Sequence, residues 1–166
     1  LWRNGDFPTA RRNLAPWTLG LLGLVLVTAF SGALVAGLDA GLTYNTFPLM
    51  DGDIIPKGMW LLTPGYLNMF ENITTVHFDH RVLAELTFLA VIALWVYARR
   101  SGISGSLFVA VNWLAGLVML QVTLGISTLL LVVPVPLAAA HQAGAVILLG
   151  AAVWVLREAS PSRKKQ

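Results

Sequence analysis

No charged residue occurs between positions 101 and 156, a stretch that reads SGISGSLFVAVNWLAGLVMLQVTLGISTLLLVVPVPLAAAHQAGAVILLGAAVWVL. A helix needs only about 20 apolar residues to cross a bilayer, so this stretch is too long for one span. Pro134 and Pro136 interrupt it, because proline lacks a backbone N–H and disfavours helical geometry in the preceding residue. The stretch therefore predicts two membrane-spanning helices, at about residues 106–132 and 137–156.

Two further apolar segments are long enough to span a bilayer. One, at about residues 16–38, carries no charge, and the other, at about 78–98, is interrupted by Arg81 and Glu85. Only 11% of the residues are charged, against about 25% in soluble domains. We therefore expect an all-α membrane protein, a four-transmembrane-helix bundle that forms a single membrane domain over residues 1–166.

The basic residues outside the spans predict the orientation, because cytoplasmic loops are enriched in Lys and Arg. The loop at 39–77 has Lys57 against four acidic residues and is assigned to the outside. Both termini are then cytoplasmic, in the inner membrane of a bacterium or, in a eukaryote, of the mitochondrion. The basic residues on the inner side are Arg3, Arg11, Arg12, Arg99, Arg100, Arg157, Arg163, Lys164 and Lys165.

The composition also excludes several classes of function. The chain has no cysteine, which excludes disulfides, thiolate metal sites and cysteine nucleophiles. The net charge of +3 follows the topology of a membrane protein, so membrane lipid is the expected partner and nucleic acid is not.

Two histidines are expected at similar depth in the outer leaflet. At about 1.5 Å per helical residue, His80 lies roughly 28 Å from Arg99, and His141 lies roughly 24 Å from Arg157. His77 would lie roughly 33 Å from the inner boundary, at the rim of a hydrocarbon core about 30 Å thick. Two imidazoles at matching depth suit axial ligation of one heme iron. The pattern alone equally allows two histidines that make hydrogen-bonded helix contacts.

Small residues beside His141 allow the same two interpretations. Ala138, Gly144 and Ala145 share its helix face, where they leave room for a flat macrocycle or for close helix packing. A zinc site would need a third ligand, which only an inward-turned Asp79 or Glu85 would supply at this depth.

Other polar residues in the spans also have a structural and a functional interpretation. Arg81 and Glu85 are spaced for a mutual ion pair, whereas a guanidinium also suits a heme propionate. The residues Gln121, Gly125 and Thr128 share one face, for which hydrogen bonding between helices is favoured over cofactor contact. A weak internal repeat pairs residues 32–35 with residues 125–128 and His80 with His141, as a pseudo-symmetric site would.

Several ordered blocks of sequence resemble the heme A synthase family of mitochondria and related bacteria, over about residues 20–158. The blocks are GALVAGLDAG at 32–41, YNTFPLM at 44–50, FEN at 70–72, FDHR at 78–81, QVTLGISTL at 121–129 and PLAAAHQ at 136–142.

The resemblance implies an oxidoreductase that oxidises the C8 methyl group of heme O to a formyl group, giving heme A for cytochrome oxidase. Such enzymes have two similar four-helix halves in a pseudo-symmetric eight-helix architecture, and this chain is similar to the C-terminal half. That half holds a heme b, whose axial ligands match His80 and His141, and Arg81 belongs to the same motif. The other half binds heme O and carries an essential glutamate; the matching position here holds His77.

The resemblance leads us to expect that the N-terminal half is missing, because the chain is truncated or because that half is supplied separately. The electron donor and the catalytic residues are unknown, the roles of His77 and Glu85 stay open, and a homo-oligomer is compatible with the sequence. Two other functions compete: a stand-alone b-type cytochrome that carries electrons, and a heme-free membrane assembly factor. Eight spans in the complete gene favour the synthase and four favour the carrier, whereas a Soret band would exclude the heme-free factor.

Overall fold

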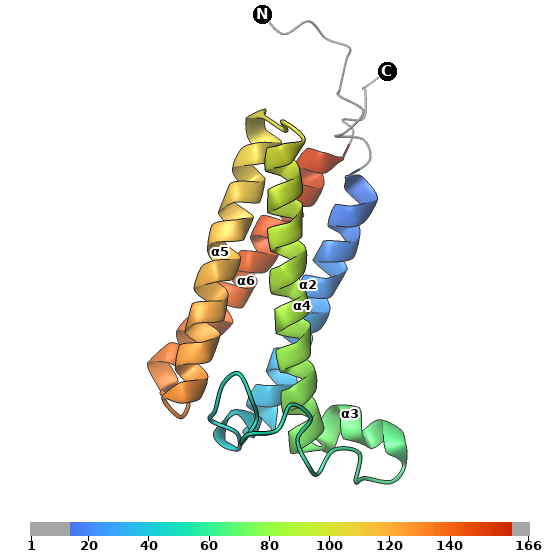
Figure 1. Cartoon of the computed structure of the whole chain (residues 1–166), viewed down its shortest axis with the longest axis vertical. Helices are drawn as coiled ribbons and strands as arrows, with labels where there is room; N and C mark the ends of the chain where they lie inside the picture. The colour runs from blue at the N-terminus through green and yellow to red at the C-terminus, as the bar shows by residue number, and fades with distance from the viewer. Residues whose placement is uncertain (1–13, 161–166) are drawn as a thin grey trace, which may run out of the picture.

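The computed structural model describes residues 14–160, which form four long helices and a structured outer loop (Figure 1). The long helices are α2 (Ala15–Gly37), α4 (Ile73–Arg100), α5 (Gly105–Leu130) and α6 (Val135–Ala159). Each is long and apolar enough to cross a membrane, which confirms the predicted all-α four-helix membrane bundle. The loop contains three short helices, η1 (Ala40–Leu42), η2 (Gly65–Leu67) and α3 (Asn68–Glu71).

The four long helices pack as a closed ring. Helix α2 packs against α4 and α6, and α5 packs against α6 and α4, whereas the diagonal pairs, α2 with α5 and α4 with α6, make little direct contact. The ring consists of two hairpins, α2–α4 and α5–α6. The two helices that carry His80 and His141 are therefore diagonal to each other across the bundle.

The apolar core is concentrated at the inner end of the bundle, where the chain enters α2 and leaves α6. Small and branched side chains fill it, as close helix packing in lipid requires. In Figure 1 the helices α4 and α5 are close at this end and diverge toward the outer loop. The core comprises Leu14, Leu21, Val25, Val91, Ala98, Leu107, Ala110, Val111, Leu114, Ala115, Val118, Leu148, Ala151, Ala152, Val155 and Ala159. Near the histidines, by contrast, the buried residues of the long helices are few.

Helix α4 begins five residues earlier than the expected span at 78–98. The side chain of Asn72 accepts a hydrogen bond from the backbone N–H of Thr75 at 3.0 Å and so caps the helix at Ile73. A cap of this kind satisfies one of the N–H groups that a helix start leaves without a partner. The expected span at 78–98 follows hydropathy, whereas the helix extends beyond this apolar stretch as far as its N-cap at Asn72.

The helix ends around the two prolines also differ from the expected ones by a few residues. Helix α5 ends at Leu130. The chain then reverses direction at Val132 and Val133, which have left-handed φ values of 60° and 55°. Helix α6 starts at Val135, so that Pro136 lies in its first turn, where a missing N–H costs nothing. The connection, residues 131–134, has the same length as the expected one at 133–136 and lies two residues earlier in the chain.

The ends of the helices agree with the expected topology. The start of α2, the end of α6 and the α4–α5 connection all lie at one end of the bundle, and the long loop lies at the other (Figure 1). Arg99 and Arg100 occupy the last turn of α4, and Arg157 the last turn of α6. Six of the basic residues that predict the orientation lie outside the described residues: Arg3, Arg11, Arg12, Arg163, Lys164 and Lys165.

Cysteine labelling tests this orientation. Asp53→Cys in the outer loop and Ser101→Cys after α4 both introduce a thiol at an exposed position of a chain without cysteine. In intact cells an impermeant maleimide is expected to label the first variant fully and the second only after permeabilisation. Labelling of Ser101→Cys in intact cells would contradict the assignment of the inner side.

Candidate functional site

His80 of α4 packs directly on a glycine of the neighbouring helix α2. A Cβ added to Gly32 would lie 3.0 Å from Cε1 of His80, which is closer than neighbouring carbons pack. Any side chain at position 32 would therefore push the imidazole away. The glycine leaves the ring in place between the two helices of the first hairpin.

His141 of α6 makes the equivalent contact within the second hairpin. A Cβ added to Gly125 of α5 would lie 2.8 Å from Cε1 of His141. Gly32 and Gly125 are the matching positions of the weak internal repeat, as are the two histidines. The structure therefore places two glycine–histidine pairs in corresponding positions of the two hairpins.

The two imidazoles differ in their hydrogen bonds. Nδ1 of His80 lies 2.9 Å from Oγ of Ser31, and that hydroxyl donates to the Thr28 carbonyl at 2.8 Å. With Nδ1 occupied in this way, Nε2 of His80 is the nitrogen left for a ligand. A hydrogen bond to the second nitrogen is the usual means by which a protein orients a metal-binding histidine.

His141 is anchored through its backbone. Its carbonyl accepts a hydrogen bond from Nε2 of Gln121 at 2.9 Å, which confirms the expected hydrogen bonding between helices on this face of α5. Nδ1 of His141 is buried without a partner. The His141 ring is thus the less constrained of the two.

Gly144, one of the small residues that suit either a macrocycle or close helix packing, accommodates another side chain. The Oε1 atom of Gln121 occupies the space in which a Cβ of Gly144 would lie. Helix packing therefore accounts for this small residue. Ala138 and Ala145 are half-buried, and no contact assigns either of them to packing.

His77 lies one helical turn before His80 on α4, at the outer end of the bundle where the depth estimate placed it. It is buried beneath the outer loop rather than exposed at the rim, and its ring packs edge-on against Tyr44 with centroids 6.1 Å apart. Both His77 and His141 act electrostatically on His80. All three imidazoles therefore lie in one region at the outer end of the bundle.

Arg81 holds the outer loop rather than Glu85. Its Nη2 donates to the carbonyls of Thr46 and Pro48 at 2.9 and 3.0 Å, and its guanidinium lies 5.6 Å from the ring centre of Phe47. Glu85 is exposed and no hydrogen bond joins it to Arg81, so the mutual ion pair, one of the two interpretations of this spacing, is not formed. Nη1 of Arg81 is buried without a partner. This nitrogen is therefore left to donate hydrogen bonds to an anionic group.

The segment 44–48 contacts His77 through Tyr44 and is tied to the surrounding helices. Besides the bonds from Arg81, Asn45 donates to the carbonyl of Leu129 in α5 at 2.9 Å. The hydroxyl of Tyr44 lies 3.3 Å from that of Thr74 in α4. The sequence analysis did not assign roles to Ser31, Tyr44 or Asn45; polar residues at the outer ends of apolar spans were the signal that could have identified them.

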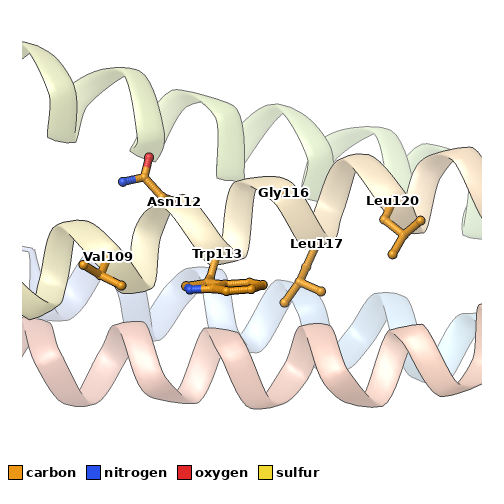
Figure 2. Close-up of a pocket in the computed structure, with 6 residues that line it drawn as sticks. All are labelled: Val109, Asn112, Trp113, Gly116, Leu117 and Leu120. Atoms are coloured by element: carbon orange, nitrogen blue, oxygen red, sulfur yellow. The ribbon is translucent and has the colours of Figure 1, made fainter.

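An apolar groove along α5 is a separate feature. Figure 2 shows it lined by Val109, Asn112, Trp113, Gly116, Leu117 and Leu120. All six residues precede Gly125 on the same helix, toward the inner end. The only polar side chain, Asn112, is already bonded to the indole N–H of Trp95 at 2.9 Å. The groove offers no titratable group and is not part of the histidine site.

Within residues 14–160, no group of three or more His, Cys, Asp or Glu side chains is arranged to hold a metal ion. Most ligands of a metal ion at this site would therefore have to come from a prosthetic group rather than from protein side chains. A porphyrin supplies four nitrogens and leaves two axial positions, which two imidazoles can fill.

Alanine substitutions test whether the glycines position the histidines. Gly116→Ala on α5 meets nothing within 4 Å and should stabilise the helix by about 0.5–1 kcal/mol. Gly125→Ala on the same helix collides with His141 and should cost about 1–3 kcal/mol through overpacking. Thermal unfolding in detergent is expected to show a raised Tm for the first variant and a lowered Tm for the second. Equal shifts would contradict the tight glycine–histidine contact.

Comparison with known proteins places the chain in a family. The model of the COX15-CtaA family, described as cytochrome oxidase assembly protein, matches residues 4–153. The chain is 50% identical over 147 residues to the protein named heme A synthase of Nitrosospira multiformis, covering 89% of this chain and 41% of that relative. It is 49% identical over 139 residues to heme A synthase COX15 of Bos taurus, covering 84% and 34%.

The chain thus spans about two fifths of the length of the curated relatives that it matches. No solved structure matches it. The family model covers most of the chain, including both histidines and both glycines that contact them. The chain therefore belongs to the COX15-CtaA family of cytochrome oxidase assembly proteins.

Proposed function

We propose that this chain is the C-terminal, cofactor-binding half of a heme A synthase, an oxidoreductase that oxidises the C8 methyl group of heme O to a formyl group. In this proposal His80 and His141 hold the iron of a heme b. The observation that carries it is the pair of equivalent glycine–histidine contacts, Gly32 with His80 and Gly125 with His141. Two hairpins that each present one imidazole suit a single cofactor between them.

The side chains around the two imidazoles fit a heme. Nε2 of His80 is left for a ligand by the bond between Nδ1 and Ser31. Nη1 of Arg81 is a buried donor without a partner, and guanidinium groups bind carboxylates such as heme propionates well.

The chain's own residues would have three tasks around the cofactor. Ser31 orients His80, and the two glycines fix the positions of both rings. The segment 44–48, held by Arg81, covers the site and limits the access of water from the outside. A heme ligated by two histidines supplies reversible one-electron transfer.

Other parts of the proposal concern residues beyond this chain. The relatives are named heme A synthase, which favours this function over a stand-alone b-type cytochrome. Heme O would bind to further helices in a pseudo-symmetric eight-helix protein. The membrane would be the bacterial inner membrane or the mitochondrial inner membrane.

The direct test of cofactor binding is the visible spectrum of the purified chain. Expression in membranes of a heme-producing host should give a Soret band and the sharp α and β bands of a reduced, low-spin b-type cytochrome. Pyridine extraction should yield heme b in a ratio near one per chain. A purified, folded chain without a Soret band would contradict the proposal and favour a heme-free assembly factor.

A further inference from the structure

The outer loop before α4 buries polar side chains and exposes apolar ones. Asn68 and Thr75 are 0% exposed, whereas Trp60, Leu61 and Tyr66 are 57%, 75% and 64% exposed. A loop that faces water has the opposite distribution, since apolar side chains are those most often buried. The distribution therefore indicates that the outside of this loop faces an apolar environment.

Buried amide groups organise the loop from within. Oδ1 of Asn68 accepts from the N–H of Leu62 at 2.9 Å, and its Nδ2 donates to the carbonyls of Leu62 and Gly65 at 2.9 Å each. Nδ2 of Asn72 donates to the carbonyl of Gly58 at 3.0 Å. The loop thus satisfies backbone groups internally, as an environment without water demands.

The backbone is strained where the loop turns a tryptophan outward. Trp60 has φ of 59°, a left-handed conformation that is unusual for a bulky residue. Its N–H donates to the buried Oγ1 of Thr75 at 3.3 Å, which holds this conformation. Strain that the surrounding structure maintains is typical of positions with a function, and the outcome here is an exposed indole ring.

The depth of the loop matches the outer interface of a bilayer. Helix α4 has 28 residues, a length of about 42 Å, close to the 40–45 Å of a bilayer with its headgroups. Since Arg99 and Arg100 end α4 at the inner face, its start at Ile73 lies at the level of the outer headgroups. Helix α3 immediately precedes this start and projects sideways from the bundle in Figure 1.

We propose that the outer apolar surface inserts into the interface of the outer lipid leaflet beside the bundle. This surface comprises Trp60, Leu61, Leu62, Tyr66, Met69 and Phe70. Between residues 54 and 70 the sole charged residue is Lys57, whose long side chain can reach the headgroups. Trp and Tyr are enriched at this depth in membrane proteins, so the chemistry of the surface fits lipid.

Spin labels at single cysteines test the proposal in the full chain, because it contains no native cysteine. Leu61→Cys and Tyr66→Cys report on the outer apolar surface, and Asp53→Cys is the matched control in the polar part of the same loop. The labelled chains are reconstituted in phosphatidylcholine–phosphatidylglycerol vesicles. Collisions with oxygen, which concentrates in lipid, and with a water-soluble nickel chelate are then measured. We expect oxygen to dominate at positions 61 and 66 and nickel to dominate at position 53.

The possible outcomes separate lipid from the alternatives. Nickel dominance at both Leu61→Cys and Tyr66→Cys in vesicles would show that the surface faces water, and the proposal would be wrong. Nickel dominance in vesicles with protection in native membranes would instead identify a protein partner, which also overturns it. Quenching of Trp60 fluorescence by brominated lipid, in a variant with the other tryptophans replaced by phenylalanine, gives an independent measurement without a label.

Discussion

Replacement of either His80 or His141 by alanine is expected to abolish the low-spin b-type spectrum, because each imidazole would fill one axial position of the same iron. The variants should lose the cofactor or hold a high-spin, five-coordinate heme. Reduced-minus-oxidised spectra of purified protein measure this directly. The loss should be complete for both variants, since the two glycine contacts give the rings equivalent positions in the two hairpins.

His77→Ala is the matched control for these substitutions. It removes a third imidazole from the same region, but one that packs against Tyr44 beneath the loop. Its spectrum should remain low-spin. Added imidazole should restore six-coordination in His80→Ala and in His141→Ala if the bundle is still folded, which distinguishes a missing ligand from a misfolded protein. An unchanged spectrum in His141→Ala would refute the ligand assignment.

The number and order of the spans were predictable because they depend on local composition. A charge-free run longer than one membrane crossing must be divided, and the two prolines at 134 and 136 mark where. The orientation stays a prediction from Arg and Lys in the short segments, which the cysteine labelling tests. These features need no knowledge of how the helices rotate against each other.

The contacts of the site could not be predicted, since they depend on helix rotation. Small residues allow both close helix packing and cofactor binding. The sequence therefore could not show that Gly125 packs against the His141 ring, whereas Gly144 packs against the side chain of Gln121. For the same reason, the sequence could not decide between an Arg81–Glu85 ion pair and other partners of Arg81. The backbone carbonyls of Thr46 and Pro48 are distant from Arg81 in the sequence, yet they accept hydrogen bonds from its guanidinium.

The chain by itself is expected to produce no heme A. An iron held by both His80 and His141 has all six positions filled, so it offers no position at which oxygen could bind. Oxidation of an unactivated methyl group would then need a second heme site with ligands of its own. The remaining histidine, His77, is buried against Tyr44, and no further histidine exists in these 166 residues.

Expression in cells that lack their own heme A synthase tests this expectation. Hemes extracted from cells with this chain alone should contain heme O and heme b but no heme A on chromatography, even when the b-type spectrum shows that the chain is folded and loaded. Full-length synthase from a relative such as that of Nitrosospira multiformis is the positive control. Joining the chain to the remaining part of that relative should restore heme A, and in this hybrid His80→Ala should reduce the yield. Heme A from the chain alone would contradict the division of roles proposed here, and would place the oxidation at the region shared by His80 and His141.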